Sequence, residues 1–129
     1  MKTGLDRIQG KKIAILGLSF KENTDDIRES VSIKLIKLLL KQKCKISVHD
    51  PKAIENTRNV FGDKLSYHKT TQDVLKDSDC AVVMTPWEEY KKLGRKDFQI
   101  MRHPLVIDTR RIVRVDDEKI NYIGLGVGT

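Results

Sequence analysis

Apolar residues recur along the chain in short runs separated by segments of helical periodicity. The short runs predict buried strands at Lys12–Leu16, Lys45–Val48, Leu65–His68, Cys80–Met84 and Leu105–Ile107, with a last strand at Tyr122–Leu125. The run at Cys80–Met84 is apolar without interruption, which is typical of a central strand. Residues 1–10 show no sustained period, so we interpret them as a lead-in segment to one domain over residues 11–129.

Helical periodicity lies between these strands. It predicts helices at Asp26–Lys43, from Pro51 to near Gly62, at Thr71–Lys76 and at Trp87–Leu93. Asp50 is expected to cap the second of them, with Pro51 in its first turn. The apolar arc of the first helix is broader than one sheet contact needs, which suggests that another domain or subunit covers it as well.

Strands that alternate with helices predict the α/β class and a Rossmann-like three-layer domain with a mainly parallel sheet. In such folds ligands bind at the carboxyl ends of the strands. Three segments follow predicted strands directly: "GLSFK", "MTPW" and "DTRR". We therefore expect the functional site among them.

The segment Gly17–Ser30 combines a glycine turn with cations and carboxylates between a strand and a helix. Lys21 offers a point charge and Arg28 a rigid fork of donors, both suited to phosphate oxygens. The alternative is structural: Asp25 and Asp26 cap the helix and pair with these cations. A dinucleotide fingerprint needs three glycines, and only Gly17 is present, so self-sufficient NAD binding is disfavoured.

Four motifs together resemble one known family. "GLSFKENTDDIRES", "VHDPKAIENTRNVFGD", "DCAVVMTPWEEY" and "VIDTRRI" occur in the order and approximate spacing of the C-terminal, UDP-binding domain of the UDP-glucose/GDP-mannose dehydrogenases. These are NAD-dependent oxidoreductases that oxidise a nucleotide sugar at C6. The resemblance runs from about Lys11 to the end of the chain, and it implies a UDP-sugar-binding domain whose N-terminal and central partner domains lie outside this sequence.

The resemblance also implies roles for single residues. Phe20 would pack near the nucleotide sugar, Lys21 would contact the substrate or its phosphates, and Arg110 would lie in the sugar-nucleotide site. Arg28 would reach across to the pyrophosphate of NAD held mainly by the missing N-terminal domain. From the residues alone, Arg110 is equally well a solvated cation after a strand, and Trp87 is best interpreted as a packing aromatic. Two positions, Thr109 and Pro86, depart from the family's usual glycine and glutamate.

Catalysis in this family uses a cysteine within a glycine-rich motif, and neither Cys44 nor Cys80 has that setting. We therefore assign no catalytic residue and predict that the isolated domain is inactive. The three histidines lack metal-ligand spacing, so no metal site is expected. Two cysteines without a framework, and no apolar run long enough to span a bilayer, predict a cytoplasmic protein with reduced thiols.

The net charge of +7, from 25 Lys and Arg against 18 acids, predicts attraction to polyanions. Scattered lysines and few aromatic residues argue against nucleic acid as the partner. The alternative function is a stand-alone basic Rossmann-like module for nucleotides or nucleic acid, and a purely structural role in an oligomer is a third. Within the family, "DPKAIENTRNVFGD" favours oxidation of UDP-glucose to UDP-glucuronate over a UDP-aminosugar, in an enzyme that is a homo-oligomer when intact.

Overall fold

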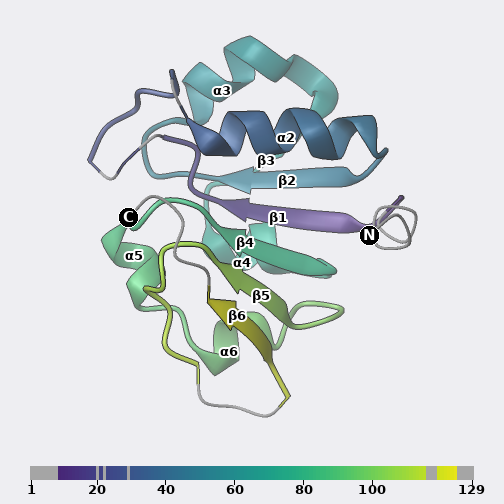
Figure 1. Ribbon diagram of the computed structural model, residues 1–129, viewed down its shortest axis with the longest axis vertical. Helices are drawn as coiled ribbons and strands as arrows, with labels where there is room; N and C mark the ends of the chain where they lie inside the picture. The colour runs from purple at the N-terminus through teal and green to yellow at the C-terminus, as the bar shows by residue number, and fades with distance from the viewer. Residues whose placement is uncertain (1–8, 20, 22, 29, 116–118, 125–129) are drawn as a thin grey trace.

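Parallel strands form one sheet at the centre of the computed structural model, which describes residues 9–19, 21, 23–28, 30–115 and 119–124. Within these residues the sheet has six strands in the order β3-β2-β1-β4-β5-β6, and every neighbouring pair is parallel (Figure 1). The strands are β1 (Lys12–Leu16), β2 (Lys45–His49), β3 (Ser66–Tyr67), β4 (Cys80–Val83), β5 (Leu105–Asp108) and β6 (Asn121–Gly124). The predicted α/β, Rossmann-like class is confirmed.

The strand order reverses between β1 and β4, which lie side by side at the middle of the sheet. Ile13 aligns with Ile46 of β2 on one side and with Cys80 of β4 on the other. All four residues of β4 are buried, as its apolar run predicted. In an open α/β sheet, the crevice outside such a reversal is where ligands bind.

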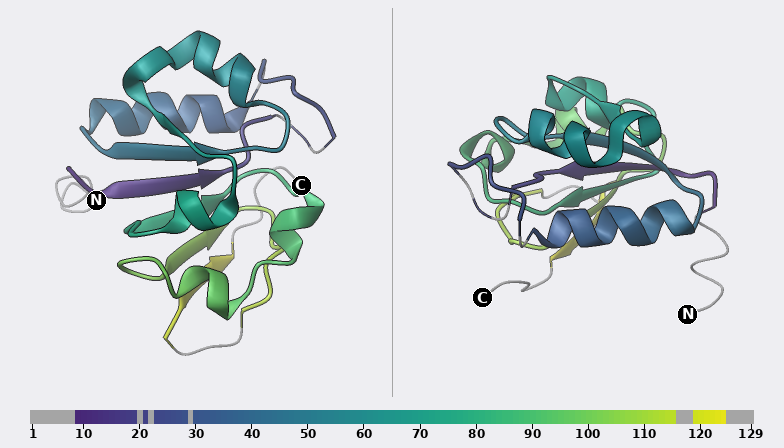
Figure 2. Two further views of the ribbon diagram at one scale, coloured as in Figure 1. Left: turned by 180° about the vertical axis from the view of Figure 1, so that it is seen from behind. Right: turned by 90° about the horizontal axis from the view of Figure 1, so that it is seen from above.

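Helices lie on both faces of the sheet. They are α2 (Val31–Lys41), α3 (Ile54–Phe61), α4 (Thr71–Leu75), α5 (Glu88–Lys91) and α6 (Arg95–Phe98), with a short 3-10 turn, η1, at Gly62–Lys64. In Figure 1 α2 lies in front of the sheet, whereas α4 and α6 lie behind it, and the left view of Figure 2 shows the reverse.

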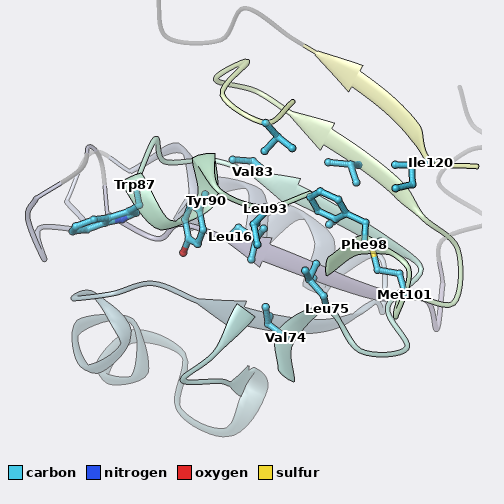
Figure 3. Close-up of a cluster of buried hydrophobic side chains, with 14 residues drawn as sticks. Leu16, Val74, Leu75, Val83, Trp87, Tyr90, Leu93, Phe98, Met101 and Ile120 are labelled. Atoms are coloured by element: carbon cyan, nitrogen blue, oxygen red, sulfur yellow. The ribbon is translucent and has the colours of Figure 1, made fainter. Parts of the chain in front are cut away.

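Each face has its own core. The core behind the sheet in Figure 1 contains Tyr90 and Phe98, both fully buried, and Figure 3 shows it running from Trp87 at one end to Ile120 and Met101 at the other. The core on the α2 face is built around Ile36 of α2, Phe61 of α3 and the other side of the same strands.

The first helix begins later than predicted. α2 starts at Val31, not at Asp26, and its N-cap is Ser30, whose Oγ accepts a hydrogen bond from Ser32 N at 3.2 Å. The expectation that Asp25 and Asp26 cap this helix is therefore wrong. The backbone of residues 24–28 forms side-chain-supported turns instead: the Thr24 hydroxyl accepts from Asp26 N, and the Asp26 carboxylate accepts from Arg28 N.

The second helix also differs at its start. α3 begins at Ile54, so Pro51 lies outside it, and its N-cap residue Ala53 has no side-chain hydrogen bond. Its predicted end is confirmed, because Gly62 follows Phe61 with φ +56, a conformation that suits glycine. Further differences include α6 (Arg95–Phe98), which the pattern did not predict, and β6, which begins one residue early at Asn121. Leu125, the predicted end of that last strand, lies outside the described residues.

One part of the sheet is not covered by a helix among the described residues. On the α2 face, beside α2, an apolar groove of about 410 Å³ opens over β4 and β5. It is lined by Ile13, Val31, Leu35, Leu39, Cys80, Val82, Met84, Leu105, Ile107 and Thr109. Val31 at its rim is half exposed. None of the described helices is long and apolar enough to cross a lipid bilayer.

Candidate functional site at the carboxyl edge of the sheet

The three segments singled out in the sequence follow adjacent strands. β4 lies between β1 and β5, and the arrowheads of all three end on the same side in Figure 1. Leu16 aligns with Val83, and Val83 aligns with Asp108, so the three strands also end at one level. The loops that carry Lys21, Trp87 and Arg110 therefore start at one edge of the sheet, which the sequence predicted only on the assumption that these strands are neighbours.

Hydrogen bonds join these loops into one surface. The Thr85 hydroxyl donates to the carbonyl of Ser19 at 2.9 Å, which ties the loop after β4 to the loop after β1. The Thr109 amide and hydroxyl both donate to the carbonyl of Val83, at 3.0 and 2.7 Å. Thr109, a departure from the family pattern, is thus a buried anchor between β4 and β5.

Gly17 permits the first of these contacts. Its φ is +104, and a Cβ at this position would lie 2.5 Å from Thr85 Oγ1 and 2.6 Å from Thr85 N. Its amide donates to the carbonyl of His49 at 2.9 Å. No side chain fits here, because the loop after β4 occupies the space that a Cβ would need.

Asp50 is the buried centre of this edge. Its Oδ2 accepts hydrogen bonds from the amides of Leu18 (2.7 Å) and Ser19 (3.1 Å) and from Trp87 Nε1 (3.1 Å). Its Oδ1 accepts from the amides of Lys52 and Ala53, at 2.8 and 2.9 Å. Asp50 therefore holds the loops after β1, β2 and β4 together and does not act as the helix cap predicted for it.

The same contact changes the interpretation of Trp87. Its ring is buried in the core of Figure 3, as expected of a packing aromatic, but its indole N–H also donates to Asp50. The packing role was predicted, but the hydrogen bond between Trp87 and Asp50 was not. The available signal was an Asp-Pro pair directly after a strand, at the edge where ligands bind.

Lys21 and Arg110 are presented from this edge. Lys21 is exposed, and its carbonyl accepts from the Ser19 hydroxyl at 2.8 Å, which fixes the backbone that carries it. Arg110 is half-buried and its amide donates to the Asp108 carboxylate at 3.1 Å, whereas Arg111 is exposed with φ +55. The structure thus distinguishes the two arginines. Phe20, the third expected substrate contact, lies outside the described residues.

Asp108 sets the turn that carries Arg110. Its side chain is fully buried, and its second oxygen, Oδ2, accepts from Val113 N at 2.7 Å and from the Tyr122 hydroxyl at 2.9 Å. Burial, together with the hydrogen bond to this carboxylate, raises the pKa of Tyr122 to about 12. The buried Asp108 carboxylate therefore fixes the turn after β5 through hydrogen bonds, as the Asp50 carboxylate fixes the loop after β1.

Arg28 lies in a different environment. Its guanidinium makes two hydrogen bonds to the Asp26 carboxylate, both at 3.0 Å, and its side chain is 87% exposed. The hydrogen bonds from Arg28 lower the pKa of Asp26. Residues 24–28 and Asn56 line an open hollow whose lining includes neither Lys21 nor Arg110. The sequence motifs also predict that Lys21, Arg28 and Arg110 converge around a single pocket for a diphosphate, and this convergence stays a prediction.

Both cysteines and one histidine, His49, are buried. Cys44 and Cys80 are buried thiols; burial raises the pKa of both, that of Cys80 to about 11. His49 is buried with its Nδ1 2.7 Å from the Tyr90 hydroxyl, and burial lowers its pKa. Among the described residues, no three or more His, Cys, Asp or Glu side chains are grouped to hold a metal ion.

Comparisons with known proteins identify relatives of this chain. A family model, described as the UDP-binding domain of the UDP-glucose/GDP-mannose dehydrogenase family, matches residues 14–115. The UDP-glucose 6-dehydrogenase AglM of Haloferax volcanii is 44% identical over 106 residues, which cover 82% of this chain and 24% of that protein. The UDP-glucose 6-dehydrogenase YwqF of Bacillus subtilis is 35% identical over 114 residues, covering 88% of this chain and 26% of that protein.

Solved structures give the same result. A UDP-glucose dehydrogenase from the hyperthermophilic archaeon Pyrobaculum islandicum superposes with a TM-score of 0.75 at 34% identity, over 93% of this chain and 26% of that one. The chain thus spans about a quarter of the length of the relatives that it matches.

Proposed function

Because the chain belongs to the UDP-glucose/GDP-mannose dehydrogenase family and matches its UDP-binding domain, we propose that it is the substrate-binding part of an NAD-dependent dehydrogenase that converts UDP-glucose to UDP-glucuronate. The observation that carries this proposal is the continuous surface formed by the loops after β1, β4 and β5, from which Lys21 and Arg110 are presented. The identity of 44% to a UDP-glucose 6-dehydrogenase supports the choice of sugar.

Lys21 and Arg110 are the proposed contacts to the UDP part of the substrate. Both follow strands whose carboxyl ends are adjacent, and the backbone of each makes a hydrogen bond to a nearby side chain, at 2.8 Å for Lys21 and 3.1 Å for Arg110. A lysine suits a phosphate as a point charge, and an arginine adds a planar pair of donors. Phe20, the residue directly before Lys21, is proposed to pack against the nucleotide sugar.

The residues of this chain do not fit a complete NAD site. In a dinucleotide-binding loop the amides after the first strand face the pyrophosphate, but here the amides of Leu18 and Ser19 donate to Asp50. We therefore place NAD on a domain outside this sequence, where it would accept the hydride. Arg28 is proposed to contact the NAD pyrophosphate, which its exposed position on Asp26 supports.

The apolar groove over β4 and β5 is the proposed docking surface for the rest of the longer enzyme. Parallel sheets are normally covered on both faces, and the part of this chain that matches its relatives covers only 24% and 26% of their length. The lining is apolar except for Thr109, so an apolar helix of the central domain fits it. Alone at micromolar concentration the chain should sediment as a monomer; a stable dimer abolished by Ile107→Lys would assign the groove to a second copy instead.

Homo-oligomer formation is proposed for the intact enzyme, and the buried thiols are compatible with a cytoplasmic location.

Calorimetry on the isolated chain tests the proposed function. UDP and UDP-glucose should bind, NAD should bind more weakly than UDP, and NAD reduction with UDP-glucose should be absent. Lys21→Ala should weaken UDP binding about tenfold or more, because a hydrogen bond to a charged group contributes about 1.5–3 kcal/mol. Lys96→Ala, an exposed lysine of α6, is the control and should change nothing. Tighter binding of NAD than of UDP would overturn the assignment, and salt-sensitive RNA binding without UDP binding would favour the stand-alone module.

A further inference from the structure

A carboxylate occupies the place where a nucleotide-binding loop usually holds a phosphate. The amides of two consecutive residues after β1, Leu18 and Ser19, converge on one oxygen of Asp50 at 2.7 and 3.1 Å. Consecutive amides that converge in this way form an anion-binding concavity. In this chain the anion is internal, and Asp50 is only 3% exposed.

The carboxylate connects more than this loop. Trp87 Nε1 from the loop after β4 shares the same oxygen, and the amides of Lys52 and Ala53 bind the other one. With the Ser19 hydroxyl, 3.3 Å from Oδ2, six groups from three segments thus surround one side chain. Because each bond to an ionised acceptor is stronger than a neutral one, the set fixes the relative positions of the loops. The Ser19 hydroxyl extends this order to Lys21, whose carbonyl it binds at 2.8 Å.

We propose that Asp50 is a positioning residue for substrate binding: it fills the amide site of the β1 loop, so that the loop binds the diphosphate of its ligand through side chains and not through its backbone. This inference rests on the proposed function, since it assumes that the ligand is a uridine diphosphate. Its chemical consequence is specific. The ligand's phosphates lie at side-chain distance from the β1 loop, where Lys21 reaches them, and the buried carboxylate holds Lys21 in place.

Chemical rescue separates this role from a general contribution to stability. Asp50→Ala removes the carboxylate and leaves a hole lined by the same six groups, which formate can refill. UDP affinity should fall about tenfold or more, since misplaced binding groups cost that much. About 100 mM sodium formate should recover most of this loss, whereas sodium chloride at the same concentration should recover none.

Matched variants and readouts keep the inference falsifiable. In Asp50→Asn the hole stays filled, so UDP affinity should fall without rescue by formate; Asp63→Ala, an exposed acid of η1, should bind UDP like the wild type. Circular dichroism confirms that each variant is folded.

Absence of UDP binding by the wild type would refute the proposed function itself. If the wild type binds, a folded Asp50→Ala with wild-type affinity, or one restored equally by chloride, overturns the inference. If Asp50→Ala does not fold even with formate, Trp87→Phe carries the test: it should weaken UDP binding about threefold, and unchanged affinity would overturn the inference.

Discussion

Gly17 and Thr85 approach so closely that a Cβ on Gly17 would lie 2.5 Å from the Thr85 hydroxyl oxygen. The contact joins the loops after β1 and β4 at the point where the strand order reverses. Because Thr85 N lies at 2.6 Å as well, rotation of the Thr85 side chain cannot relieve the clash. The glycine is therefore required by packing as well as by its φ of +104.

Gly17→Ala should destabilise the domain by about 2–4 kcal/mol, because overpacking and an unfavourable backbone conformation add. Urea unfolding followed by circular dichroism measures this. Gly62→Ala is the matched control: its φ is also positive, at +56 with ψ −129, but nothing lies within 4 Å of its Cβ position, so the loss should be only the backbone cost of about 1–3 kcal/mol, less than in Gly17→Ala. Equal losses in the two variants would show that the contact with Thr85 is not what requires glycine.

Ser30→Ala should destabilise the domain by about 1–3 kcal/mol. The side chain caps α2 by accepting from Ser32 N, and its hydroxyl also donates to the buried carbonyl of Leu18 at 2.7 Å. The loss should exceed that of an ordinary cap, because a buried carbonyl is left without its donor. Ser66→Ala, an exposed serine of β3, serves as the control in the same unfolding experiment. A loss no larger than the control's would contradict this role.

Stability should fall as the pH drops below about 6.5, the ordinary pKa of histidine. Burial lowers the pKa of both His49 and His68. Below pH 6.5 the unfolded chain therefore binds protons that the folded chain does not, so acid favours unfolding, whereas above this pH the contribution is constant. Melting temperatures between pH 5 and 8 measure the effect. His49→Gln should flatten the slope between pH 5 and 6.5; an unchanged slope would contradict a contribution from His49.

Both thiols should react slowly with Ellman's reagent in the folded protein at pH 8. Cys44 and Cys80 are buried, and burial raises both pKa values, so little thiolate forms. Adding urea to unfold the chain should release both thiols within minutes. Rapid reaction of Cys80 in native buffer would show that the groove it lines is open to solutes, and would reopen the question of a reactive cysteine in this domain.

The strands could be predicted from the sequence because their signal is local. The runs at Lys12–Leu16 and Cys80–Val83 are buried on both faces, and such runs identify central parallel strands. The alternation of elements also predicted a parallel sheet whose carboxyl ends share one edge, but the order that places β4 between β1 and β5 was not predicted. These parts depend on periodicity, which a sequence contains directly.

The start of α2 and the role of Asp50 could not be predicted in this way. Asp25 and Asp26 look like helix caps in sequence, but Ser30 is selected by a bond to Leu18, which lies 12 positions away. The donors to Asp50 Oδ2 lie 31 to 37 positions away, on loops whose proximity only the folded sheet creates. α6 was missed because it has only four residues, and the burial of Phe98 does not create a periodic pattern.

The most direct test of the binding surface is a titration of the ¹⁵N-labelled chain with UDP, followed by NMR. The amides of Ser19, Lys21, Thr85 and Arg110, together with the Trp87 indole N–H, should shift with one common dissociation constant. Their strands end at the same edge of the sheet. Shifts confined to the opposite edge, at Cys44, Asp79 and His103, or no shifts at millimolar UDP, would contradict a UDP site at the carboxyl ends of β1, β4 and β5.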